Sequence, residues 1–79
     1  MKEVDSYKED DYRYKDYKLD KKEIKKLSNY FNHQFKASDT RLLIIYSFMG
    51  DLVAAQVQED STWDLSPEEL KKLFINIPN

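Results

Sequence analysis

The sequence predicts a small α+β domain of (β)αββα order, in which an antiparallel β-hairpin packs against two helices. The first observation is a pair of β-type runs, over residues 41–48 and 52–58. The second is an amphipathic helical pattern over residues 21–36. The third is a complete helix start at Ser66-Pro67, which precedes another helical stripe.

Residues 1–11 are mostly charged, and Val4 is their only aliphatic residue. Burial therefore cannot offset the entropy that such a segment would lose on ordering. We expect these residues to form a flexible arm. A chain of 79 residues is long enough for one domain, which we place at residues 12–79.

Residues 12–19 have the aromatic content of a β-strand. Strand alternation would place Tyr12 and Tyr14 on one side, and Tyr17 and Leu19 on the other. A tyrosine-bearing tail remains the alternative, because the segment is rich in charge and no turn residue precedes it.

The first helix is predicted to begin after Asp20, which forms a capping box with Glu23. Its apolar stripe consists of Ile24, Leu27, Phe31 and Phe35. The outer side is basic and carries Lys22, Lys25, Lys26, His33 and Lys36. We expect His33, the single histidine, to be an exposed surface residue.

Gly50-Asp51 separates the two β-type runs, and a glycine in the first central position favours a two-residue type II′ turn. Such a turn would place Ile44 opposite Val57 and Tyr46 opposite Ala55. The core-facing residues would then be Leu42, Ile44, Tyr46, Phe48, Val53, Ala55 and Val57.

The other face of this hairpin is more apolar than a solvated sheet face should be. We expect a second copy of the chain to cover it in a homodimer, and the alternative is that the N-terminal segment lies across it. The expected interface residues are Leu43, Ile45, Met49, Leu52 and Ala54.

The second helix is predicted to start with Ser66 as N-cap, Pro67 at the first helical position and Glu69 as the reciprocal capping partner. Its stripe consists of Leu70, Leu73, Phe74 and Ile77, and Pro78 lies just beyond its end. This stripe should pack on the aromatic face of the hairpin.

The chain lacks the residues that several classes of function need. Gly50 is the only glycine, which excludes the usual phosphate-binding loops, and the chain has no cysteine to pair with its one histidine. We expect no enzymatic activity, no metal site and no cofactor. The longest apolar run, residues 42–49, is too short to span a bilayer. Because the chain has no cysteine for the disulfides that usually support very small extracellular domains, we expect a cytoplasmic protein.

Charge is segregated along the chain. Between Leu42 and Leu70 there are six carboxylates and no Lys or Arg, whereas ten of the thirteen basic residues precede Ala37. We predict an acidic, partner-binding surface with Trp63 as its aromatic anchor. Its members are Asp51, Glu59, Asp60, Trp63, Asp64, Glu68 and Glu69. The alternative is a solvated acidic loop, in which Trp63 only closes the core.

The favoured hypothesis is a small regulator or inhibitor that blocks a basic, nucleic-acid-binding protein. A row of carboxylates can imitate the phosphates of DNA, although a formal net charge of −2 is small for a DNA mimic. The size and composition fit a phage-encoded protein that acts in the host cytoplasm.

The alternative hypothesis is a nucleic-acid-binding module. Tyrosines can stack on unpaired bases while basic side chains contact phosphates. The residues in this case are Tyr12, Arg13, Tyr14, Lys15, Tyr17, Lys22, Lys25, Lys26 and Lys36.

Overall fold

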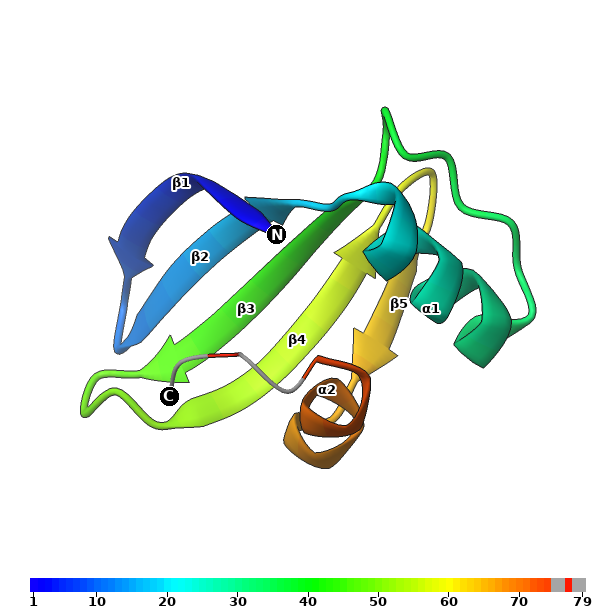
Figure 1. Cartoon of the computed structure of the whole chain (residues 1–79). Helices are drawn as coiled ribbons and strands as arrows, with labels where there is room; N and C mark the ends of the chain where they lie inside the picture. The colour runs from blue at the N-terminus through cyan, green and yellow to red at the C-terminus, as the bar shows by residue number, and fades with distance from the viewer. Residues whose placement is uncertain (75–76, 78–79) are drawn as a thin grey trace.

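The computed structural model describes residues 1–74 and 77, and in them the chain forms one five-stranded antiparallel sheet and two helices (Figure 1). The strands lie side by side in chain order, as an antiparallel meander. They are β1 (Lys2–Glu9), β2 (Tyr12–Lys18), β3 (Arg41–Ser47), β4 (Leu52–Gln58) and β5 (Thr62–Leu65). The helices are α1 (Lys21–Phe31) and α2 (Pro67–Leu73). The predicted α+β class is confirmed.

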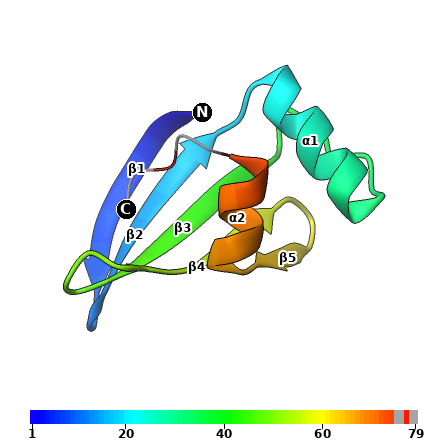
Figure 2. The ribbon, with the colours of Figure 1, turned by 60° about the horizontal axis from the view of Figure 1, so that its bottom comes forward.

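Both helices pack on the same face of the sheet, and the core lies between them and the strands (Figure 2). Leu27 of α1 and Leu70 of α2 are fully buried, together with Leu42 and Ile44 of β3. The opposite sheet face has no helix over it in the described part of the chain. The fold thus leaves a broad sheet surface open to solvent.

The N-terminal segment differs from the expected arm, because residues 2–9 form β1 and pair with β2 along their whole length. All eight β1 residues are exposed. Backbone hydrogen bonds and cross-strand contacts therefore hold this strand in place, and a prediction from burial could not find it. The strand predicted over residues 12–19 is confirmed, with Tyr17 and Leu19 buried in the core.

Helix α1 begins as predicted and ends earlier. The Glu23 amide donates to the Asp20 carboxylate at 2.8 Å, and the Asp20 amide donates to the Glu23 carboxylate at 2.9 Å. The helix stops because Asn32 adopts a left-handed conformation, with φ of 52°. Phe35 therefore lies outside the helix, although it is still buried in the core.

The β3–β4 hairpin has a different loop from the one predicted. Gly50, with φ of 92°, is the third of the four residues between the strands, and its amide donates to the Ser47 carbonyl at 2.9 Å. Ile44 consequently pairs with Ala55 and not with Val57. A shift of two residues keeps the same side chains on each face, so the core side of β3 is as predicted.

A β-bulge next to this loop changes the faces near the turn. Tyr46 pairs with Leu52, which therefore packs against the core and does not lie on the open face. Phe48 and Val53, which were predicted in the core, are 64% and 40% exposed.

The last part of the chain contains a strand that the sequence reasoning missed. β5 pairs with β4 and directs Trp63 and Leu65 toward the core. Helix α2 has the predicted capping box, in which Ser66 and Glu69 bond reciprocally at 2.9 and 3.1 Å. α2 ends at Leu73, earlier than the predicted stripe, because Phe74 is extended. Phe74 and Ile77 therefore lie beyond the helix, although Phe74 is buried in the core and Ile77 packs against it, and Pro78 lies outside the described residues.

Candidate binding surface

Glu59, a member of the predicted acidic surface, is hydrogen-bonded to other parts of the fold. The Glu59 side chain is 8% exposed. It accepts a hydrogen bond from the Lys36 backbone amide at 2.6 Å, and it lies 3.3 Å from Nε2 of His33. The bond from the Lys36 amide is the main cause that lowers the pKa of Glu59. Glu59 therefore fastens the β4–β5 turn to the segment after α1.

His33 is half-buried, whereas the sequence predicted an exposed residue. It lies beyond the end of α1, with its ring centroid 4.8 Å from that of Trp63 and 4.6 Å from that of Phe35. Trp63 also contacts Phe31, with ring centroids 5.4 Å apart. The tryptophan thus belongs to an aromatic cluster at the edge of the core.

The remaining acidic residues do not share one surface. Asp64 follows Trp63 in β5 and therefore faces the opposite side of the sheet. Asp51 lies at the other end of β4 from Glu59, about 26 Å away at the rise of an extended strand. Glu69 is engaged with Ser66 and accepts a hydrogen bond from the Tyr30 hydroxyl. Asp60 and Glu68 are exposed.

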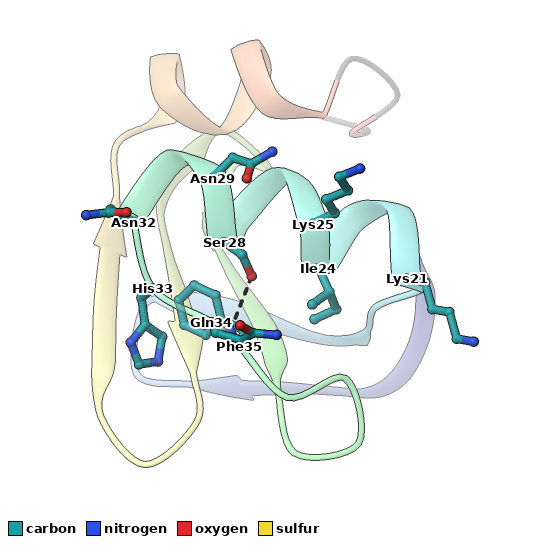
Figure 3. Close-up of a pocket in the computed structure, with 9 residues that line it drawn as sticks. All are labelled: Lys21, Ile24, Lys25, Ser28, Asn29, Asn32, His33, Gln34 and Phe35. Atoms are coloured by element: carbon teal, nitrogen blue, oxygen red, sulfur yellow. Dashed lines mark hydrogen bonds between the residues drawn. The ribbon is translucent and has the colours of Figure 1, made fainter.

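A shallow hollow of about 500 Å³ lies between α1 and residues 33–35 (Figure 3). Figure 3 draws one hydrogen bond between the residues that line this hollow, from the Phe35 amide to the Ser28 hydroxyl at 3.2 Å. Lys21, Asn32 and His33 point outward from the hollow, so polar groups do not converge on a common point. Among the described residues, no group of three or more His, Asp or Glu could hold a metal ion.

The open sheet face, which we call the tyrosine face, has its side chains in rows across the strands. The strand pairing fixes these rows, because directly opposite residues share a face. The aromatic row consists of Tyr7, Tyr14, Ile45 and Ala54. On one side of it lie Glu9, Tyr12 and Ser47, next to the turn residues Asp10 and Asp11.

On its other side, the aromatic row is followed by an acidic row and then by a basic row. The acidic row consists of Asp5, Asp16, Leu43, Gln56 and Asp64. The basic row consists of Lys2, Lys18, Arg41, Gln58 and Thr62. Carboxylates therefore border the tyrosines on both sides, and the cations of this face lie one row farther away.

The tyrosines form an ordered and accessible platform. The rings of Tyr7 and Tyr14 are stacked, with centroids 4.9 Å apart and planes 12° apart. Tyr7 and Tyr12 are 42% and 43% exposed. Partial burial, with Glu9 as the next contribution, raises the pKa of Tyr14. Negative charge on nearby carboxylates, among them Glu9, therefore acts on the platform.

One charged pair on this face is imperfectly matched. Burial raises the pKa of Asp16, while the charge of Arg41 acts in the opposite direction. Within the described residues, Oδ1 of Asp16 and Nη1 of Arg41 are buried without a hydrogen-bond partner.

The predicted nucleic-acid-binding residues are divided between surfaces. Tyr12 and Tyr14 lie on the tyrosine face, whereas Arg13, Lys15 and Tyr17 lie on the helix side of β2. The Arg13 guanidinium is 5.8 Å from the Phe48 ring centroid. The predicted lysines on and after α1, which are Lys22, Lys25, Lys26 and Lys36, are exposed. The tyrosines therefore do not share a face with most of the basic side chains.

The predicted dimer interface is also divided. Leu43, Ile45 and Ala54 lie on the tyrosine face, although Leu43 is only 8% exposed. Leu52 turns to the core, and Met49 lies in the loop and is 83% exposed. Sequence reasoning noted Tyr7 and the tyrosines of β2, but it did not recognise β1 and so did not place Tyr7 beside Tyr14 on one sheet face.

Comparisons with protein-family models, curated proteins and solved structures each find no match to this chain. Neither described helix combines the length and apolar character that a membrane crossing requires. In residues 1–74 and 77, the structure defines a small α+β domain with one sheet face that no helix covers.

Proposed function

We propose that this chain is a non-catalytic protein-binding domain whose tyrosine face binds a basic segment of another protein. The observation that carries the proposal is the stack of the exposed Tyr7 on the partly exposed Tyr14, which lies between carboxylates on both sides. In this role the chain regulates or inhibits its partner in the cytoplasm, which for a phage-encoded protein is that of the host.

The surface suits cationic side chains, and arginine in particular. A guanidinium over an exposed tyrosine ring gains about 0.5–1 kcal/mol, and a neighbouring carboxylate adds hydrogen bonds and charge attraction. Glu9 and Asp16 lie on opposite sides of the Tyr7–Tyr14 row. An arginine side chain that lies on this row can therefore reach a carboxylate in either direction.

The same chemistry explains how the domain would inhibit a nucleic-acid-binding protein. A segment that contacts phosphates through Lys and Arg would meet carboxylates on the tyrosine face. Binding here would remove that segment from nucleic acid by competition. This mechanism does not require a strongly acidic chain, because carboxylates border the Tyr7–Tyr14 row on both sides.

Fluorescence anisotropy with a short labelled Arg-rich peptide tests the proposal. We expect saturable binding that weakens with salt, and a tenfold or greater loss in Tyr7→Ala/Tyr14→Ala. Tyr30→Ala is the matched control, because Tyr30 is 45% exposed on α1, away from this face. Equal affinity of the double variant and the control would refute the proposal.

A second measurement uses labelled single- and double-stranded DNA. We expect no direct binding, and we expect the protein to release DNA from a complex with the Arg-rich peptide. Tight direct binding of DNA, lost on substitution of Lys22 and Lys25 by Glu, would instead support the nucleic-acid-binding hypothesis.

A further inference from the structure

β1 is an edge strand whose outer side lies beside no other described segment. It is the first strand of the sheet and pairs only with β2 (Figure 1). An edge strand presents unpaired N–H and C=O groups that can bind another strand. The other edge, β5, has four residues, whereas β1 has eight. β1 therefore offers the longer pairing site.

The charges of β1 are complementary to those of a second, antiparallel β1. Lys2-Glu3 begins the strand and Lys8-Glu9 ends it. In a two-fold pairing centred on Ser6, Tyr7 lies opposite Asp5 of the second copy. Beyond this pair the β-bulge between Glu3 and Asp5 shifts the pairing by one residue, so Lys8 lies opposite Glu3 of the second copy and Glu9 lies opposite its Lys2. The two-fold symmetry doubles these contacts, and four ion pairs form across the junction.

The β-bulge of β1 makes this register possible. The pairing with β2 shifts by one residue between Glu3 and Asp5. As a result, Glu3 and Lys8 both lie on the helix side, opposite Tyr17 and Arg13 of β2. Without the bulge, Glu3 and Lys8 would face opposite sides of the sheet and could not meet across a symmetric junction.

Neighbouring registers are unfavourable. Centring the junction on Asp5 would place the Asp5 side chains of both copies directly opposite each other. Centring it on Tyr7 would place Asp5 opposite Glu9, which is again a like-charge pair. Charges on edge strands usually prevent pairing, but here they select one register in which every lysine of β1 meets a glutamate.

We propose that two copies of this chain associate through antiparallel pairing of their β1 strands, centred on Ser6. The result is one continuous ten-stranded sheet, because each copy contributes five strands. The two-fold axis is perpendicular to the sheet, so both tyrosine faces lie on the same side. The inference does not rest on the proposed function of that face.

Charge exchange tests the proposal with the full chain. We expect sedimentation velocity to show a dimer for the wild type, and at least tenfold weaker association for Lys2→Glu/Lys8→Glu and for Glu3→Lys/Glu9→Lys. An equimolar mixture of the two variants should form a heterodimer in native mass spectrometry. Lys22→Glu/Lys25→Glu, with the same charge change on α1, should remain a dimer.

Several results would overturn the proposal: a monomeric wild type at about 0.5 mM, variants that dimerise as well as the wild type, or a mixture without heterodimers. Loss of the dimer in Ile45→Glu, with the β1 variants unaffected, would place the interface on the tyrosine face instead. Lys8→Glu alone is a milder test at one exposed side chain, and circular dichroism shows whether each variant is folded.

Discussion

Replacement of Glu59 by Ala should destabilise the fold, because this carboxylate joins two segments that are distant in sequence. The Thr40 hydroxyl has one proton, which it donates to the Lys36 carbonyl at 2.6 Å in preference to the Glu59 carboxylate at 3.2 Å. The Thr40 hydroxyl therefore keeps its main hydrogen bond when Glu59 is replaced. The half-exposed His33 can bond to water instead. The main loss is therefore the bond from the Lys36 amide, for which we expect about 2 kcal/mol.

The loss of stability in Glu59→Ala should depend on pH, and the pKa of Glu59 determines whether it grows or shrinks as pH falls. Its folded-state pKa lies below the ordinary value of 4.5. The carboxylate therefore stabilises the fold above pH 4.5, and this contribution is lost as pH falls through the lowered pKa. Glu59→Gln keeps a neutral acceptor and should cost about 1 kcal/mol at pH 7. The difference in free energy of unfolding between Glu59→Gln and the wild type should become smaller toward pH 3.

Urea denaturation at pH 7, 5 and 3 measures these differences. Asp60→Asn is the matched control, because it removes the neighbouring charge at an exposed position and should change stability little. Equal stability of Glu59→Ala and Asp60→Asn at pH 7 would contradict the assigned role of Glu59. A gap between Glu59→Gln and the wild type that is constant with pH would show that the charge itself contributes nothing.

Two further predictions concern the backbone and a buried phenol. Asn32→Gly should raise the free energy of unfolding by about 0.5 kcal/mol, because glycine adopts the left-handed conformation at φ of 52° without a Cβ penalty; a lower urea midpoint than that of the wild type would refute this. Burial raises the pKa of Tyr46 to about 12, so its contribution to stability is complete below pH 10.0 and is lost as pH rises toward 12. Absorbance titration should therefore show a late ionisation phase that is missing in Tyr46→Phe, and phenols that all titrate near pH 10 in the folded protein would contradict it.

The features that the sequence predicted correctly are those with a local cause. The starts of both helices depend on capping residues three positions apart, Asp20 with Glu23 and Ser66 with Glu69. The alternation of apolar residues also identified the core side of β3. These signals need no knowledge of the rest of the chain.

The errors concern interactions between distant segments. β1 is held by pairing with β2 and not by burial, so its composition resembles that of a disordered arm. The register of the β3–β4 hairpin depends on a bulge and on the place of Gly50 in the loop. The partners of Glu59 lie 19 to 26 residues away, so its internal role could not be read from the surrounding acidic sequence.

The missed strands also explain why the candidate surface changed. Without β5, Trp63 and Asp64 appear to be neighbours on one acidic patch, whereas a strand separates them onto opposite faces. Without β1, Tyr7 appears to belong to a flexible arm, whereas pairing places its ring on that of Tyr14. Strand alternation in β2 separates Tyr12 and Tyr14 from Arg13 and Lys15. The aromatic and basic residues that alternate in the sequence are therefore divided between two faces, and carboxylates lie beside the tyrosines on one of them.

The two proposals can be separated, because they use different atoms of the same hairpin. Peptide binding uses the ring faces of Tyr7 and Tyr14, whereas β1 pairing uses the backbone edge and the charged ends of the strand. A dimer would place two tyrosine faces side by side, and a partner with two basic segments would then gain avidity. A linked pair of Arg-rich peptides should therefore bind the wild type more tightly than a single peptide. Lys2→Glu/Lys8→Glu should lose this advantage while it still binds the single peptide, and retention of the full advantage by this variant would show that β1 pairing does not bring the faces together.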